Sequence, residues 1–119
     1  MTFKSNEEGY EVTAIFGGVK PELITNHQLL KDLSLKLLKK AGFTVLSASE
    51  YEFSPQGYTF IVLLAESHFA VHTYPEYSSI YFHLYSCGEK SEKEIFSSLK
   101  EILKPKKASF KKKLIRVGK

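Results

Sequence analysis

The spacing of apolar and polar residues along the chain predicts six strands and two helices. Alternation is clearest over residues 79–87. Since successive side chains of a strand point to opposite faces, this segment has one apolar face and one mixed face. The apolar face holds Ile80, Phe82 and Leu84, and the other holds Tyr81, His83, Tyr85 and Cys87. The other predicted strands are 10–16, 43–53, 58–65, 69–74 and 109–117, and the highly apolar 58–65 is expected near the centre of the sheet.

Two segments have the three- and four-residue spacing of helices that are apolar on one side. The first follows Asn26, a suitable N-cap, and ends at Gly42, a suitable stop. Its apolar positions are Leu29, Leu30, Leu33, Leu37, Leu38 and Ala41. The second begins with the capping box Ser91-x-x-Glu94 and ends before Pro105. Its inward positions are predicted to be Ile95, Leu99, Ile102 and Leu103.

The order of these elements indicates the fold class. Four consecutive strands joined by short turns favour antiparallel pairing, and two amphipathic helices need a sheet face on which to bury their apolar sides. We therefore predict an α+β fold, a two-layer sandwich in which an antiparallel sheet carries both helices on one face. The length of 119 residues predicts a single domain covering 1–119.

Composition narrows the class of protein. Hydrophobic residues at 43% and charged residues at 25% are ordinary values for a globular protein. No apolar run reaches the roughly 18 residues that a membrane span needs, and the first residues do not resemble a signal peptide, so a cytoplasmic location is expected. The single cysteine, Cys87, rules out an internal disulfide and a cysteine-based zinc cluster, and no metal site is predicted.

The basic residues are unevenly distributed. Residues 104–119 hold eight of the 17 lysines and arginines and no acid. Such a segment can bind nucleic acid by neutralising phosphates. A second interpretation, which we favour, is an edge strand whose lysines discourage pairing with other chains.

The segment that follows the apolar strand 58–65 carries the most distinctive chemistry. Ser67 lies between Glu66 and His68, without the Gly-x-Ser-x-Gly turn of a hydrolase nucleophile. His72 follows five residues later, so in an unbroken strand its side chain and that of Ser67 would point to opposite faces. Either the two never meet, or the chain turns sharply near Ser67. Taken alone, these residues also fit a serine at a strand end and a half-exposed histidine.

A longer motif includes these residues. It reads Ala65-Glu66-Ser67-His68-x-x-x-His72-Thr73-Tyr74-Pro75-Glu76, followed by Ser86-Cys87-Gly88 and preceded by Phe53-x-Pro55-x-Gly57. The motif, with its serine-to-histidine offset of five and serine-to-cysteine offset of 20, resembles the short prokaryotic S-adenosylmethionine decarboxylase proenzymes. Less specific similarity extends from about residue 10 to residue 104.

This resemblance implies a zymogen that cuts its own chain. Cleavage between Glu66 and Ser67 would give residues 1–66 (the beta chain) and 67–119 (the alpha chain), and Ser67 would become a pyruvoyl group. That cofactor holds the substrate amine as a Schiff base during decarboxylation. The implied product is decarboxylated S-adenosylmethionine, which is used in spermidine and other polyamine biosynthesis.

The resemblance also implies a role for each matching residue. His72 would transfer protons during processing, with support from the hydroxyl group of Thr59. Cys87 would donate the proton that completes catalysis. Phe53 would stack on the adenine ring of the substrate, and Glu76 would bind the ribose hydroxyl groups.

Two departures from the family pattern keep other functions open. Ala14 and His83 stand where relatives usually carry acids, so the substrate could instead be arginine or ornithine on the same scaffold. A less favoured alternative is a non-catalytic partner or nucleic-acid-binding module, supported mainly by the basic tail. The resemblance further implies a homodimer of processed protomers with sites near the interface, without a role for membranes.

Overall fold

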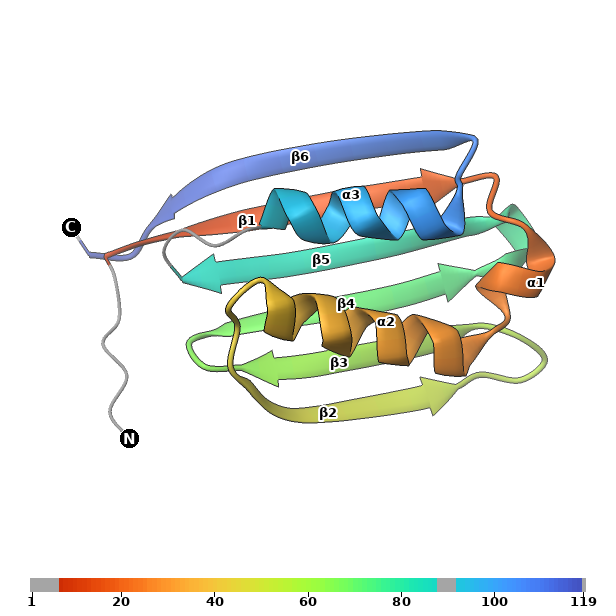
Figure 1. Cartoon of the computed structure of the whole chain (residues 1–119), viewed down its shortest axis with the longest axis horizontal. Helices are drawn as coiled ribbons and strands as arrows, with labels where there is room; N and C mark the ends of the chain where they lie inside the picture. The colour runs from red at the N-terminus through yellow and green to blue at the C-terminus, as the bar shows by residue number, and fades with distance from the viewer. Residues whose placement is uncertain (1–6, 88–91, 119) are drawn as a thin grey trace.

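A computed structural model of the chain describes residues 7–87 and 92–118. A six-stranded sheet has the order β2-β3-β4-β5-β1-β6, with every neighbouring pair antiparallel. The strands are β1 (Glu8–Gly17), β2 (Val45–Glu52), β3 (Tyr58–Leu64), β4 (Ser67–Tyr74), β5 (Ser79–Cys87) and β6 (Lys107–Arg116). The helices are α1 (Pro21–Ile24), α2 (His27–Lys40), α3 (Glu92–Leu103) and the 3₁₀ turn η1 (Pro75–Tyr77). Figure 1 shows α2 and α3 on one face of the sheet, which confirms the predicted α+β two-layer sandwich.

The core lies between the sheet and the two long helices. Strand side chains facing the helices are fully or almost fully buried, as are the apolar stripes of α2 and α3. Large, fully buried members of this core include Tyr58, Phe60, Phe69, Phe82, Leu30, Leu38, Ile95 and Leu99. Each fully buried side chain of this size stabilises the fold by roughly 1.5–3 kcal/mol, so the helix layer is firmly attached to the sheet.

Both long helices follow the predicted pattern, with one exception. The side chain of Asn26 accepts a hydrogen bond from the Leu29 N–H at 3.0 Å, and Gly42 stops the helix with a φ of +96°. The prediction that Ile102 faces inward is wrong, because this side chain is 41% exposed. Ile95, Leu99 and Leu103 form a stripe at four-residue steps, and Ile102 lies to one side of it. Ser91, the first residue of the predicted capping box, and Gly88 of the motif fall outside the described residues.

The sheet face opposite α2 and α3, which we call the open face, carries none of the helices formed by residues 7–87 and 92–118 (Figure 1). The apolar segment 58–65 was expected at the centre of the sheet, but β3 is second from the edge. Its apolar character comes from having apolar side chains on both faces, one of which is the open face. Ile61 and Leu63 are 45% and 52% exposed on the open face. The basic tail forms the edge strand β6, as predicted, and its Lys112 pairs with the buried Glu92 of α3 at 2.6 Å. No helix within the described ranges is long and apolar enough to cross a membrane.

Candidate active site

The junction between Glu66 and Ser67 lies at a tight hairpin. Leu64 of β3 pairs with Ser67 of β4, so only Ala65 and Glu66 form the turn. Glu66 has a φ of +60°, in the left-handed region that residues other than glycine rarely adopt. This conformation costs roughly 1–2 kcal/mol. The backbone is therefore strained at Glu66, directly before the peptide bond to Ser67. The sharp turn anticipated near Ser67 is therefore present.

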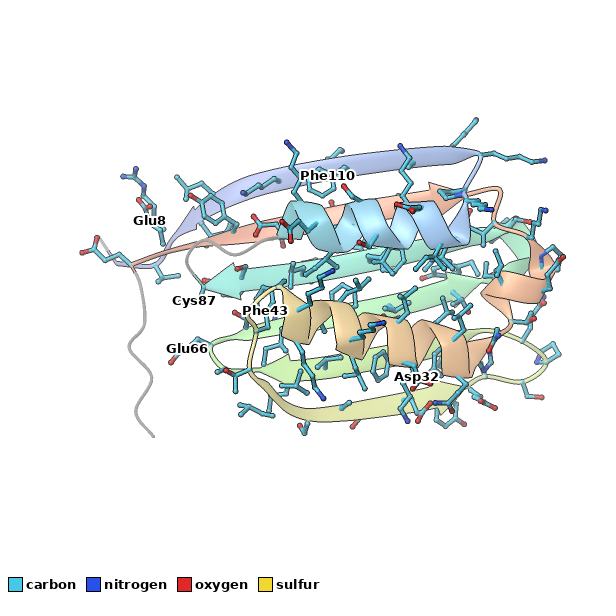
Figure 2. All side chains as sticks on the ribbon, viewed as in Figure 1. Glu8, Asp32, Phe43, Glu66, Cys87 and Phe110 are labelled. Carbon is cyan, nitrogen blue, oxygen red and sulfur yellow. The ribbon has the colours of Figure 1, made fainter. Side chains whose placement is uncertain are left out.

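Ser67 and Cys87 lie side by side at this end of the sheet. The Ser67 side chain is only 8% exposed, and its Oγ accepts a hydrogen bond from the Cys87 backbone N–H at 2.9 Å. Figure 2 labels Glu66 and Cys87 at the same end of neighbouring strands. The strict alternation of β5 places the half-buried Cys87 side chain on the open face. We call Glu66, Ser67 and Cys87 the junction half-site.

A second group of predicted residues lies at the opposite end of the sheet. Thr59 of β3 pairs with His72 of β4, and the Thr59 Oγ1 lies 3.0 Å from the His72 Nδ1. Burial, and then the nearby His83, lower the pKa of His72, so its imidazole is neutral at pH 7. A neutral imidazole can accept a proton from a hydroxyl group.

This second group surrounds a cavity of about 530 Å³. The lining residues are Phe53, Gln56, Gly57, Tyr58, Thr59, His72, Thr73, Tyr74 and Glu76. The cavity thus joins four predicted residues, Phe53, Thr59, His72 and Glu76, which we call the cavity half-site. The sequence analysis assigned no role to Tyr74, although it lies two positions after His72 and so shares its face of β4.

The two half-sites do not meet within one chain. Residues Ser67–Tyr74 form one unbroken strand, so the turn before Ser67 does not bring its side chain to that of His72. The side chains of Ser67 and His72 point to opposite faces, and five strand positions separate their backbones by about 16 Å. A single protomer therefore presents two incomplete sites.

A hydrogen-bonded chain of titratable residues lies on the open face between the half-sites. The His83 Nε2 is 3.0 Å from Glu11 Oε2, and the His68 Nε2 is 3.3 Å from His83 Nδ1. The hydrogen bond from His83 lowers the pKa of the half-exposed Glu11, and burial followed by the nearby His83 lowers the pKa of His68. The sequence analysis did not predict this chain, because its members come from β1, β5 and β4.

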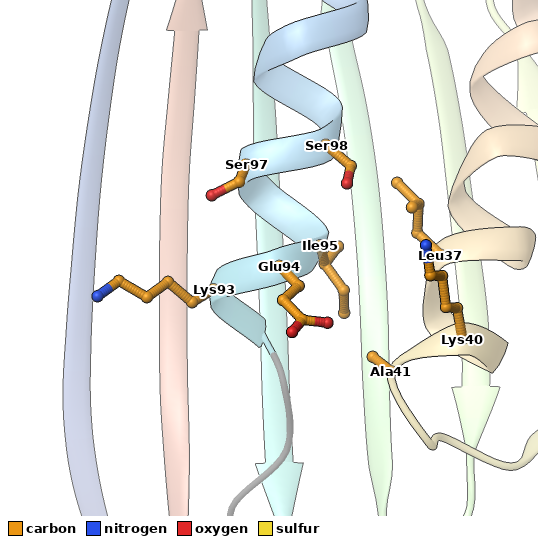
Figure 3. A pocket seen from close by; sticks show the side chains of 8 residues that line it. All are labelled: Leu37, Lys40, Ala41, Lys93, Glu94, Ile95, Ser97 and Ser98. Carbon is orange, nitrogen blue, oxygen red and sulfur yellow. The ribbon is translucent and has the colours of Figure 1, made fainter.

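A hollow on the other side of the sheet is lined by none of the predicted site residues. The hollow in Figure 3, of about 490 Å³, lies between α2 and α3, on the helix side of the sheet. Its lining residues are Leu37, Lys40, Ala41, Lys93, Glu94, Ile95, Ser97 and Ser98. Within residues 7–87 and 92–118, no three histidine, cysteine or acidic side chains are grouped as metal ligands would be.

Comparisons with known proteins agree with the motif. A family model described as S-adenosylmethionine decarboxylase matches residues 10–114. The S-adenosylmethionine decarboxylase proenzyme of Brevibacillus brevis is 39% identical over 109 residues, which cover 91% of this chain and 81% of that protein. The proenzyme of the same name from Archaeoglobus fulgidus is 36% identical over 98 residues, covering 82% of this chain and 88% of that protein.

Solved structures agree as well. The crystal structure of the adenosylmethionine decarboxylase from Aquifex aeolicus superposes with a TM-score of 0.79 at 28% identity, over 97% of this chain and 94% of that one. A Trypanosoma brucei enzyme, described as an AdoMetDC monomer, shares the fold with a TM-score of 0.62 at 11% identity, over 85% of this chain and 44% of that one. With the family model covering most of its length, the chain belongs to the S-adenosylmethionine decarboxylase family.

Proposed function

We propose that this protein is a self-processing, pyruvoyl-dependent decarboxylase of S-adenosylmethionine. The observation that carries the proposal is the junction half-site: a serine hydroxyl directly follows a strained, left-handed glutamate and lies beside the one cysteine of the chain. A strained backbone at a reacting bond favours its rearrangement, since the strain is released when the bond breaks.

Processing uses only atoms of this chain and water. The Ser67 Oγ attacks the carbonyl carbon of Glu66, and the amide becomes an ester with a free amino group on residue 67. Elimination then breaks the ester, leaving a carboxylate on Glu66 and a dehydroalanine at position 67, and hydrolysis gives the pyruvoyl group and ammonia. The Cys87 N–H holds the Ser67 Oγ in place, and the burial of Ser67 keeps competing water away.

Once formed, the pyruvoyl group supplies an electron sink for the electrons left behind when carbon dioxide departs. The Cys87 thiol donates a proton to the substrate carbon that lost its carboxyl group. In the cavity half-site, the Phe53 ring stacks on adenine and the Glu76 carboxylate accepts hydrogen bonds from the ribose. His72, held by Thr59, accepts the Ser67 hydroxyl proton during processing.

These roles require a homodimer, because the half-sites lie about 16 Å apart on one chain. We propose that two protomers pack open face against open face around a two-fold axis. The exposed Ile15, Ile61 and Leu63 would then be covered. If the axis lies in the interface and runs across the strands, the contact is reciprocal, so the Cys87 end of each chain meets the cavity half-site of the other, and each dimer has two sites. The Ser67 side chain points to the helix side of the sheet before cleavage, so the proposal requires the turn at Glu66 and Ser67 to reorient when Ser67 reacts.

Two measurements test the function. Intact-mass analysis of the purified protein should show two chains, residues 1–66 and a pyruvoyl-ended 67–119. Supplied separately with carboxyl-labelled S-adenosylmethionine, arginine and ornithine, the processed protein should release labelled carbon dioxide only from the first. Release from arginine or ornithine alone would replace the proposed substrate while keeping the cofactor chemistry.

A further inference from the structure

A groove lies between α3 and the edge strand β6, on the helix side of the sheet. It encloses a volume of about 230 Å³. Its lining residues are Phe16, Lys93, Phe96, Ser97, Lys100, Ala108, Ser109 and Phe110. None of these residues belongs to the junction half-site or the cavity half-site. We call this hollow the α3–β6 groove.

The groove exists because the helix layer ends before the sheet does. The helix-side residues of β1, Val12, Ala14 and Phe16, are at most 2% exposed. On the next strand, Phe110 pairs with Ala14 and so shares its side of the sheet, yet it is 47% exposed. Six strands about 4.8 Å apart span about 24 Å, whereas two packed helices span only about 20 Å. The border of the sheet at β6 is therefore left uncovered beside α3 (Figure 1).

The floor of the groove is aromatic and fixed by the core. Phe96 is only 5% exposed, and Phe110 contacts it edge-on, with ring centroids 5.5 Å apart and planes at 71°. Pockets for whole small molecules usually enclose about 300–1,000 Å³. The smaller volume here suits one apolar side chain of a larger partner, in the way that a buried anchor residue fills a pocket at a protein interface.

The wall that α3 contributes is basic. Lys93, Ser97 and Lys100 follow one another at steps of four and three residues, so they share one side of the helix. All three are exposed. Figure 3 shows Lys93 and Ser97 pointing toward β6, on the side of α3 away from α2. The described residues that line the groove include no carboxylate, so this wall attracts negatively charged groups.

We propose that the α3–β6 groove binds an acidic amphipathic helix of another protein, which completes the helix layer over β6. One large apolar side chain of this helix enters the hollow against Phe96 and Phe110, and its carboxylates face Lys93 and Lys100. An added strand fits less well, because the lysines of β6 discourage pairing at the sheet edge. A helix with an apolar face and acidic flanks matches the apolar floor and the basic wall together.

The test uses the purified full-length protein and a labelled synthetic helix as the probe. The probe has about 18 residues, with leucine and phenylalanine on one face and glutamate on the other. A shuffled peptide of the same composition spreads its apolar residues around the helix. Fluorescence anisotropy should give a dissociation constant at least about tenfold lower for the amphipathic probe than for the shuffled one, the scale expected for one buried anchor.

Two protein variants assign the binding to the groove. Reversing both lysines (Lys93→Glu with Lys100→Glu) should weaken probe binding about 5- to 30-fold at low salt, the combined effect of two exposed ion pairs. The same variant should bind a probe with lysine in place of glutamate more tightly than the wild type does. Ala108→Leu fills the hollow and should weaken binding of the acidic probe about tenfold or more.

Each variant has a matched control elsewhere on the surface. Lys36→Glu with Lys39→Glu makes the same change of charge on exposed positions of α2. Ala48→Leu makes the same change of size on β2, the exposed strand at the opposite edge of the sheet. Neither control should alter probe binding. Circular dichroism and thermal unfolding should show that all four proteins remain folded.

The remaining outcomes would overturn the proposal. Failure of the wild type to bind the acidic probe would do so, and so would equal binding of the shuffled peptide or equal effects of variants and controls. Tighter binding of single-stranded DNA that depends on Lys93 and Lys100 would assign the basic wall to nucleic acid. Sedimentation analysis covers the last case: a smaller assembly after the lysine reversal would show that a second copy of this chain covers the groove.

Discussion

Mixed dimers provide a direct test of a site shared between two chains. Cys87→Ala removes the proposed proton donor of the junction half-site, and Glu76→Ala removes the proposed ribose-binding carboxylate of the cavity half-site. The two half-sites are about 16 Å apart on one chain, so neither change should disturb the local structure of the other. Each variant alone should process normally and have little decarboxylase activity.

The expected recovery follows from the symmetry. When the two variants are co-expressed in equal amounts, random pairing makes half of the dimers mixed. In a mixed dimer both changes fall in one shared site, and the other site contains neither change. Half of the dimers are mixed, and half of the sites in each mixed dimer are intact, so about a quarter of all sites are intact. The preparation should therefore recover about a quarter of wild-type activity.

The assay is the release of labelled carbon dioxide per milligram of processed protein. Cys87→Ala co-expressed with Ser67→Ala is the matched control, because both changes lie in the junction half-site and no intact site can form in their mixed dimer. Activity of the Cys87→Ala and Glu76→Ala mixture that stays at the sum of the two single variants would refute the shared site. A quarter-scale recovery in the control pair would refute the assignment of half-sites.

Three further predictions concern single chains. Ser67→Ala should remain one uncut polypeptide without activity, which mass spectrometry checks directly; a cut product would contradict the serine mechanism. Cys87→Ala should still be cut, but turnover should fall about 10²-fold or more, as expected when a general acid is lost. The pKa of His72 is lowered on folding, so protonation favours the unfolded chain, and urea stability should decrease as the pH falls below about 6.5. His72→Gln should decrease less over the same range, and an equal decrease would contradict the assigned cause.

Sequence patterns predicted the elements whose two faces differ. In β5 and α2 one side faces the core and the other does not, so alternation and helical spacing indicated both their type and their orientation. β3 was misplaced for a physical reason. Its apolar residues Ile61 and Leu63 lie on the open face and not in the core, and a single sequence does not distinguish the two environments.

The candidate site was predictable only in its local parts. The parity of strand positions showed that Ser67 and His72 would not meet in an unbroken strand, and it left a sharp turn near Ser67 as one of two possibilities. The cavity half-site depends on the register between strands, because its lining residues come from different segments of the chain. The same holds for the hydrogen bond between His83 and Glu11, since these residues are 72 positions apart.

The strand order has a consequence for the cut protein. The proposed cleavage after Glu66 would assign β1, β2, β3 and α2 to one piece and β4, β5, β6 and α3 to the other. The pieces are interlaced, because β1 of the first lies between β5 and β6 of the second, and β3 pairs with β4. The backbone hydrogen bonds of three strand interfaces thus hold the two polypeptides together after the covalent link is lost. Once unfolded, however, the processed enzyme must reassemble from two separate molecules, so its recovery from denaturant should depend on concentration in a way that the uncut precursor's does not.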